Sequence, residues 1–314
     1  MYNFFRRGSL GLCLFLSTLG LSLLPGCKSP DITPVVLRVM TYNIHHAEGL
    51  DGKVDLDRIA NVIRQSNADI VALQEVDKNT ERTGGIDMPA DLAQLTGMNV
   101  AFGPNLDNFQ GGQYGTAILS RFPIESHENH RLKQARKGEQ RGVLLAVLAV
   151  NQGQLLFACT HLDHTADQAE RLFSETQFAD LFAAYPALPI LLCGDFNDTP
   201  DSELYRRLSK NWTDAWNIAG ESNGYTMSSD NPTRRIDYIL LSDKKNFKVR
   251  WLDVPKTEAS DHLPLVAEIR FTPAPRPMGS PELALLIIVM GLLSTIPLGI
   301  AATIFISSRR SKQP

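Results

Sequence analysis

The chain has 314 residues, of which 43% are hydrophobic and 21% are charged. This composition suits one large globular domain or two small ones and excludes a disordered or low-complexity protein. The net charge of −3 is unevenly distributed, because residues 32–275 contain 24 Lys and Arg against 32 Asp and Glu, a net charge of −8. Such an acidic segment lacks the electrostatic signature of a general nucleic-acid-binding protein.

The segment 1–26 has the pattern of an export signal. A pair of arginines precedes an apolar stretch over residues 10–24, which is too short to favour a membrane-spanning helix. The segment 24–27, with the sequence LPGC, resembles a bacterial lipobox, so we expect cleavage before Cys27 and a lipid on its sulfur. Ordinary secretory cleavage nearby and an uncleaved anchor are the alternatives. We assign residues 27–35 to a linker.

The C-terminus carries a second membrane signal. Residues 283–306 contain no charged side chain and are long enough to cross a bilayer as a helix. The basic tail 307–314 predicts a cytoplasmic end and disfavours a glycolipid-anchor signal, which usually ends in apolar residues. A proline-rich linker over 273–282 precedes the span. Together the two termini predict that residues 36–272 lie outside the cytoplasmic membrane, in the periplasm or on the outer face.

The middle of the chain alternates apolar runs with helical patterns. In chain order we predict a strand over 35–41, a helix over 55–66, a strand over 70–73, a polar loop over 77–87, a helix over 89–97 and strands over 115–120, 143–150 and 154–160. These are followed by a long helix over 165–185, a strand over 189–193, a short helix over 202–208 and strands over 235–240 and 265–271.

Three local signals support these elements. Residues 151–153 form a turn that joins two strands into a hairpin, and Gly97 is a helix stop. Thr165 and Gln168 have the spacing of a capping box at the start of the long helix. Strands mixed with helices, some of them in hairpins, indicate an α/β domain with two mixed sheets. The sequence contains neither a glycine-rich phosphate loop nor a nucleophilic serine elbow.

The strand over 189–193 leads into the sequence GDFND at 194–198. Asp195 and Asn197 share one face of an extended chain, and Gly194 leaves room for a ligand or another backbone to come close. A carboxylate beside a carboxamide can orient a water or hold a phosphoryl oxygen near a hard cation. Ordinary turn chemistry is the alternative reading of this segment.

Two cysteines lie in the middle segment. Cys159 and Cys193 each occur in an apolar strand beside a polar motif. We predict two buried free thiols. An exported location also allows a disulfide, but the sequence alone cannot place one.

Seven short motifs occur in a specific order: YNI at 42–44, LQEV at 73–76, GTAILS at 115–120, THL at 160–162, GDFN at 194–197, RIDY at 235–238 and SDH at 260–262. In this order the chain resembles the endonuclease/exonuclease/phosphatase superfamily, which includes deoxyribonuclease I, apurinic endonucleases, neutral sphingomyelinases and inositol polyphosphate 5-phosphatases. The resemblance covers residues 36–272. It implies a four-layer α/β/β/α sandwich of the deoxyribonuclease I type with the site at one rim. Thr116 departs from the Asn of close relatives, which affects a substrate contact rather than the metal site.

The resemblance also implies a metal site. Glu75 is expected as the principal ligand of Mg²⁺, with Mn²⁺ as the alternative, because hard cations prefer carboxylate oxygens. Asn43 is expected to support the same ion. Asp261 is expected as a second-ion ligand or an orienting carboxylate.

The expected catalytic residues are His161, Asp195, Asn197, Asp237 and His262. Asp195 and Asn197 would align the attacking water or hold the phosphoryl group. His262 would act as general base or charge stabiliser, oriented by Asp237. His161 matches the histidine near the leaving group in deoxyribonuclease-like members.

Two further residues are candidates for substrate binding. Arg141 has the bidentate geometry that suits a scissile phosphate. Tyr114 is a candidate phosphate contact, with a packing role as the equal alternative.

Several other polar residues are weaker candidates. We interpret His45, His46 and His164 as polar loop residues rather than ligands. Arg82, with Gly84 and Gly85, could shape the pocket, and Arg234 with Arg235 could be a solvated pair.

These features predict a Mg²⁺-dependent phosphoester hydrolase that acts outside the cytoplasmic membrane on a lipid head group or small phosphoester. The alternatives are an extracytoplasmic nuclease of the deoxyribonuclease I type and a catalytically silent, membrane-bound binding module. The silent module is disfavoured because no catalytic carboxylate or histidine is missing. The membrane is an expected partner, nucleic acid is an alternative one, and no protein partner is predicted.

Overall fold

The computed structural model describes residues 33–275. The predicted signal segment with Cys27, the span over 283–306 and the basic tail lie outside the described residues. Among the helices within 33–275, none is long and apolar enough to cross a membrane.

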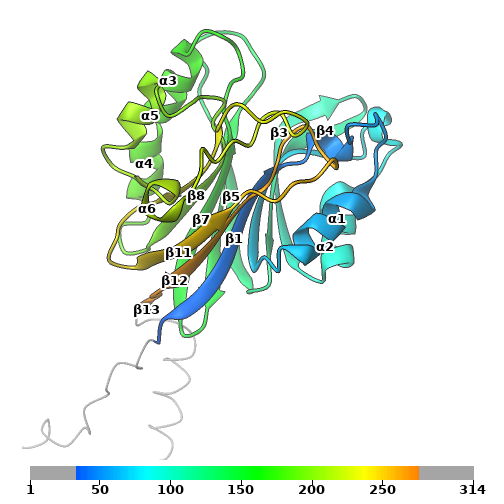
Figure 1. Cartoon of the computed structure of the whole chain (residues 1–314). Coiled ribbons are helices and arrows are strands. Elements are labelled where there is room, and N and C mark those ends of the chain that lie inside the picture. The colour runs from blue at the N-terminus through cyan, green and yellow to red at the C-terminus, as the bar shows by residue number, and fades with distance from the viewer. Residues whose placement is uncertain (1–32, 276–314) are drawn as a thin grey trace, which may run out of the picture. The chain divides into compact units, whose positions relative to one another are not determined.

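Two mixed β-sheets form the centre of the domain (Figure 1). The first has the strand order β11 (Phe247–Asp253), β12 (Leu265–Phe271), β1 (Val35–Asn43), β2 (Ile70–Lys78), β4 (Gly112–Ser120) and β3 (Asn99–Phe109). The second has the order β5 (Ile124–Arg131), β6 (Gly142–Val150), β7 (Gly153–His161), β8 (Ile190–Asp195), β10 (Asp237–Leu241) and β9 (Thr213–Asp214), and β13 (Ala274–Pro275) pairs with β7. Each sheet contains one parallel pair, β1 with β2 and β7 with β8. The prediction of two mixed sheets is confirmed.

Helices cover the outer faces of both sheets. The first sheet carries α1 (Leu56–Gln65) and α2 (Met88–Thr96), and the second carries α3 (Ala169–Thr176), α4 (Phe178–Ala183) and α5 (Glu203–Leu208). The shorter elements are α6 (Trp216–Ala219) and the 3₁₀ turns η1 (His45–Ala47) and η2 (Glu81–Thr83). One apolar core lies between the sheets and two more lie beneath the helices. This is the expected four-layer sandwich.

Local sequence signals explain several helix ends. The side chains of Asp55, Asp87 and Ser202 accept hydrogen bonds at the starts of α1, α2 and α5. Gly97 ends α2 with a left-handed φ of 69°, which a residue without Cβ adopts without steric cost.

The prediction of a single helix over 165–185 is wrong. The segment is divided into α3 and α4 at Gln177, and Gln168 at the N-cap makes no side-chain capping bond. Thr165 does not cap, because α3 begins only at Ala169, and its backbone N–H and hydroxyl both donate to the carboxylate of Asp163. Arg171 also donates to the carbonyl of Thr165 at 2.6 Å, so residues 163–168 form a tight loop instead of a helical turn.

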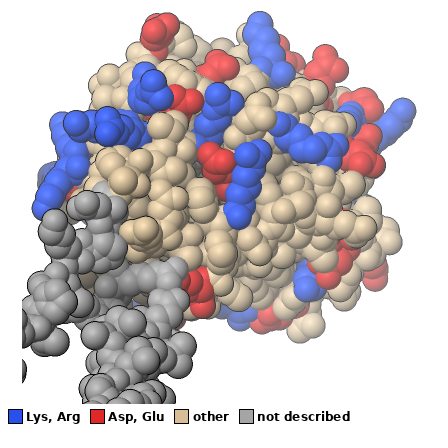
Figure 2. All heavy atoms as spheres, turned by 90° about the horizontal axis from the view of Figure 1, so that it is seen from below, with Lys and Arg blue, Asp and Glu red and all other residues tan. Residues whose placement is uncertain are grey.

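The two ends of the described domain lie together. Val35 at the start of β1 pairs with Phe271 at the end of β12, and Ala274, which we predicted to be linker, pairs with Gln154. Strand β1 then runs from this end to Asn43, at the opposite end of the sheet (Figure 1). Figure 2 shows the domain from below, the side on which β1 begins and β12 ends, where basic and acidic side chains are interspersed among neutral residues.

Candidate active site

A cavity of about 340 Å³ opens where ends of strands from both sheets meet. This volume suits a small ligand. Of the ten predicted site residues, eight line it: Glu75, Tyr114, Arg141, His161, Asp195, Asn197, Asp261 and His262. The remaining two, Asn43 and Asp237, are buried and hydrogen-bonded to lining residues. The structure therefore brings all ten together.

A β-bulge in β2 determines the position of Glu75. The pairing of β2 with β4 shifts register between Leu73 and Val76, and Glu75 has a left-handed φ of 56°. Bulges re-aim side chains, and a non-glycine residue at positive φ is held there only by its surroundings. The local strain turns the Glu75 carboxylate into the cavity.

Asn43 connects carboxylates from both sheets. Its Nδ2 donates to Glu75 Oε1 at 2.9 Å and to Asp195 Oδ2 at 3.1 Å. Its Oδ1 accepts a hydrogen bond from the backbone N–H of His45 at 3.1 Å. In this arrangement Asn43 orients the two acidic groups, and its role as a metal ligand stays a prediction.

Strand register places three site residues side by side. His161 of β7 pairs with Asp195 of β8, which in turn pairs with Asp237 of β10. A Cβ on Gly194 would lie 2.0 Å from the backbone oxygen of Thr160. The predicted close approach at Gly194 is therefore confirmed, and its neighbour is the backbone of β7.

His262 is fixed by two neighbours. Its Nδ1 donates to Asp237 Oδ2 at 3.0 Å, and its backbone N–H donates to Ser260 Oγ at 3.2 Å. Burial alone would lower the pKa of His262, but the charges of Asp237, Asp195 and Asp261 raise it to about 10. The imidazole is therefore a cation at neutral pH, which favours charge stabilisation over the role of general base.

Asp195 lies 3.7 Å from Nε2 of His262. Burial, reinforced by the charge of Asp237, raises the pKa of the Asp195 carboxyl to about 7. A group with such a pKa can accept a proton efficiently near neutral pH. Ligand atoms of Asp195, Asp237 and His262 lie within 4.8 Å of one another, so this buried cluster could also hold an ion.

The second histidine, His161, is neutral, whereas His262 is a cation. Burial, together with the positive charges of Arg141 and His262, lowers the pKa of His161 well below its usual value. Its Nε2 accepts a hydrogen bond from Asn197 Nδ2 at 3.1 Å, as a neutral imidazole can. The 3.6 Å approach of His161 to Asp195 is therefore not an ion pair.

Arg141 forms one wall of the cavity and is only 4% exposed. Its Nη1 pairs with Glu139 at 2.9 Å, and its Nη2 donates to Nδ1 of His164 at 3.1 Å. His164 is exposed, as expected of a loop residue, yet it also lines the cavity. Burial raises the pKa of Tyr114 well above its usual value, so this phenol stays protonated.

Arg82 lies in the cavity wall, whereas Gly84 and Gly85 do not line the cavity. The guanidinium donates to Asp77 at 2.6 and 2.7 Å and lies 4.9 Å from the ring centre of Phe109. Sequence reasoning missed Phe109 because it missed strand β3. The alternation of β3 was the only signal that could have found it.

The histidines that follow Asn43 are not ordinary loop residues. His45 lines the cavity, with Nδ1 4.0 Å from Asp261 Oδ1. His46 is buried, and burial together with the charge of Arg82 lowers its pKa. Both belong to the turn η1, beside the bulge that carries Glu75.

The prediction of a solvated arginine pair is wrong for Arg235. Arg234 is exposed, but Arg235 is buried and its Nη1 donates to Asp214 Oδ2 at 2.6 Å. Its guanidinium also lies 4.7 Å from the ring centre of Tyr238. Both predicted free thiols, Cys159 and Cys193, are confirmed as buried and unpaired.

The donors at the cavity fit a divalent cation. Glu75 is half-buried and points into the cavity, and Asp195 and Asp261 add further carboxylate oxygens. Oxygen donors of this kind are the preferred ligands of hard cations. The fit rests on these side chains alone.

Comparison with known proteins assigns the family. The model of the endonuclease/exonuclease/phosphatase family matches residues 40–262. The chain is 27% identical over 245 residues to uncharacterized protein YbhP of Escherichia coli (strain K12), covering 74% of this chain and 95% of that protein. It is 27% identical over 203 residues to a 5′-tyrosyl-DNA phosphodiesterase of Caenorhabditis elegans, covering 62% of this chain and 51% of that protein.

A solved structure supports the same assignment. An endonuclease/exonuclease/phosphatase from Beutenbergia cavernae DSM 12333 superposes with a TM-score of 0.65 at 26% identity, covering 77% of this chain and 73% of that one. The fold shared with this structure, the segment matched by the family model and the clustered acidic and histidine residues all support the same family. The chain belongs to the endonuclease/exonuclease/phosphatase family and is a metal-dependent phosphoester hydrolase.

Proposed function

We propose that the chain hydrolyses a small phosphoester with the help of Mg²⁺, or alternatively Mn²⁺, outside the cytoplasmic membrane. The single observation that carries this proposal is the convergence of Glu75, Asp195, His262 and Arg141 on one cavity. This set supplies cation ligands, a proton acceptor and positive charge around one phosphoryl group.

The cation has a defined role in this proposal. Glu75, with Asn43 and Asp261 beside it, would hold the ion, which supplies a Lewis acid that neutralises charge on the phosphoryl oxygens. The remaining chemistry is assigned to side chains of the chain itself.

Asp195 is the proposed acceptor of the proton from the attacking water, because its pKa of about 7 is matched to this task. Cationic His262, oriented by Asp237, stabilises negative charge that develops on the phosphoryl group. Neutral His161, held by Asn197, is the proposed partner of the leaving group.

The charge and size of the site favour a small substrate. Among the described residues only two arginines, Arg82 and Arg141, line the cavity, and this is too little positive charge for the many phosphates of a long polyanion. A molecule with one or two phosphate groups needs only the cation, Arg141 and a few donors. The cavity of about 340 Å³ is consistent with such a molecule.

The location is proposed from the two ends of the sequence. An export signal with a lipobox and a C-terminal span would hold the domain on the outer side of the membrane. A protease added to spheroplasts should then digest residues 36–272 without lysis. Protection of this segment until the cells are lysed would argue against an external location.

The substrate class is tested with the full chain purified in detergent with Mg²⁺. Nucleotides, sugar phosphates, inositol phosphates, phospholipids, plasmid DNA and RNA would be compared by kcat/KM. We expect a small or lipid phosphoester to be preferred. Plasmid or RNA cleavage far above every small phosphoester would overturn this order.

A nuclease is the second candidate function. The pair His161 and His262 supports it, because a histidine pair of this kind characterises the deoxyribonuclease-like members. The C. elegans relative is itself named a DNA phosphodiesterase. A silent binding module would show no turnover of any of these substrates.

A further inference from the structure

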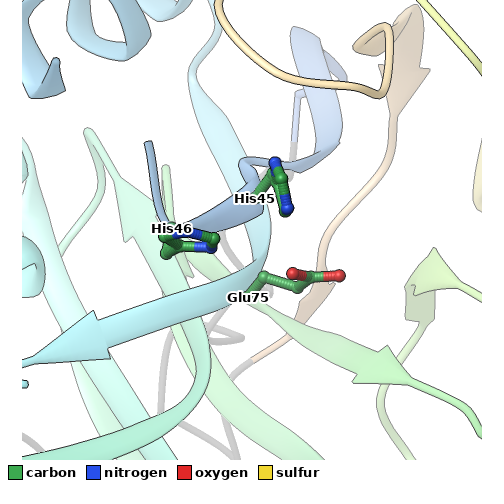
Figure 3. Close-up of side chains that lie close together, drawn as sticks. All are labelled: His45, His46 and Glu75. Carbon is green, nitrogen blue, oxygen red and sulfur yellow. The ribbon is translucent and has the colours of Figure 1, made fainter. Parts of the chain in front are cut away.

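The turn η1 has an unusual backbone. His45, His46 and Ala47 are three consecutive non-glycine residues with left-handed φ values of 43°, 42° and 62°. Each is uncommon alone, and such conformations persist only where the surrounding structure imposes them. The turn directs two adjacent imidazoles toward the carboxylate of Glu75 (Figure 3).

The three side chains have the proximity of metal ligands. One ring nitrogen from each histidine and one carboxylate oxygen of Glu75 lie within 4.8 Å of one another. The two ring centres are 4.5 Å apart, with the ring planes at 69°. Only a small closing movement would bring the three donors into one coordination shell.

His46 provides an independent observation. Its side chain is 8% exposed, and its Nδ1 has no hydrogen-bond partner among residues 33–275. The other ring nitrogen, Nε2, lies 3.4 Å from Glu48 Oε2. An imidazole that bonds a carboxylate through one nitrogen is a common metal ligand through the other.

We propose that His45, His46 and Glu75 form a binding site for a divalent transition-metal cation such as Mn²⁺ or Zn²⁺. Imidazole nitrogen suits these ions, whereas Mg²⁺ prefers oxygen ligands throughout. Glu75 is also the ligand of the cation in the proposed function, and this shared ligand is the only point at which the present proposal rests on that function. The two histidines therefore give the ion at Glu75 a preference for a transition metal over Mg²⁺.

The test measures ion binding without turnover, so its failure is distinct from failure of the proposed hydrolase. The full chain, produced without a histidine tag, is freed of metal with a chelator and titrated with Co²⁺, followed by visible absorption, and with Mg²⁺, followed by calorimetry. The variants are His45→Ala, His46→Ala and the control His127→Ala, whose imidazole is exposed on β5.

We expect His45→Ala and His46→Ala each to weaken Co²⁺ binding at least about tenfold, the lower range seen when metal sites lose a supporting group. Mg²⁺ binding should change much less, and His127→Ala should bind both ions like the original protein. Should His46→Ala fail to fold, His45→Ala decides, because its side chain is 33% exposed and its removal leaves the core intact.

Two results would overturn the proposal. One is Co²⁺ binding by His45→Ala that equals binding by His127→Ala. The other is an equal loss of Co²⁺ and Mg²⁺ affinity in His45→Ala, because the histidine would then act only on the position of Glu75.

Discussion

At the scale of single residues, two histidines in one cavity differ in charge because their neighbours differ. His262 donates to Asp237 and lies near Asp195, and these carboxylates outweigh the effect of its burial. His161 is equally enclosed but has Arg141 and His262 nearby, so it stays neutral. Environments that shift the pKa values of two neighbouring titratable groups in opposite directions are typical of acid–base catalysis.

This difference predicts a bell-shaped pH dependence of kcat/KM. Activity should rise with pH as Asp195, with a pKa of about 7, loses its proton, and fall as His262, with a pKa of about 10, loses its own. Because the two groups interact, the measured values belong to the pair. Asp237→Asn removes the charge that raises both pKa values, so both limbs should move to lower pH.

The control for this profile is Asp201→Asn, which removes an exposed carboxylate outside the cavity. Its limbs should coincide with those of the original protein. If the pH profile of kcat/KM were the same in Asp237→Asn as in the original protein, the roles assigned to Asp195 and His262 would be wrong.

Glu75 allows a direct prediction about the cation. Glu75→Gln keeps the size of the side chain and one acceptor oxygen for Asn43 but removes its charge, so kcat should fall at least about a hundredfold, as on loss of one key electrostatic group. Chelation of divalent ions should abolish turnover of the original protein. Steady-state kinetics, with circular dichroism to check folding, measure the effect.

Glu81→Gln provides the matched control, because Glu81 is an exposed carboxylate on η2 that does not line the cavity. It should retain full activity. Full activity of the original protein after exhaustive chelation would refute a role for the cation.

At the scale of elements, the sequence predicted the central strands well and the edge strands poorly. The strands over 265–271 and 143–150 match β12 and β6 to within one residue. The long strands that were missed, β3, β5 and β11, each lie at an edge of a sheet. Edge strands carry polar and charged side chains, which weakens the alternation on which prediction depends.

The site residues also divide into some that the sequence predicted and some that it did not. Asp195, Glu75 and His262 were found because each occurs in a recognisable motif at or beside a strand end. Arg82 was only a weaker candidate, and Phe109 and the turn η1 were not assigned to the site, because their positions depend on the β2 bulge and on an edge strand. Single-sequence patterns report periodicity but not a register shift.

The contact between β7 and β8 gives a prediction at this scale. Gly194→Ala would place a methyl group 2.0 Å from the Thr160 carbonyl oxygen, so the strands must separate locally. We expect a loss of unfolding free energy of about 1–3 kcal/mol, as for other overpacked sites. Because His161 and Asp195 follow on the same strands, kcat should also fall.

Denaturant unfolding and kinetics would measure the two effects. Gly138→Ala is a suitable control, because a Cβ there would meet only the flexible end of Gln134, at 3.8 Å. Unchanged stability and activity in Gly194→Ala would show that neither property depends on the close approach of β7 and β8 at Gly194.

At the scale of the whole molecule, the cavity and the two ends of the described segment lie at opposite ends of the sandwich. Strand β1 begins at Val35, beside Phe271, and ends at Asn43, next to the cavity. Its nine residues correspond to a separation of about 30 Å at the usual rise of a strand. We propose that, if both ends are tethered to one membrane with this end of the domain held against it, the cavity faces away from that membrane.

This geometry predicts a preference for soluble over membrane-bound substrate. The full chain, reconstituted into vesicles, should hydrolyse a soluble phosphoester with the kcat/KM that it shows in detergent. A phosphoester of the same head-group chemistry, placed on a lipid of the same vesicle, should be hydrolysed much more slowly, because in the proposed orientation the cavity would lie about a strand length from the lipid surface. The same lipid dispersed in detergent is the control, since there it can reach the cavity freely. Equal rates for the lipid in vesicles and in detergent would mean that the domain lies with its cavity rim against the bilayer, and a lipid head group would then become the favoured substrate.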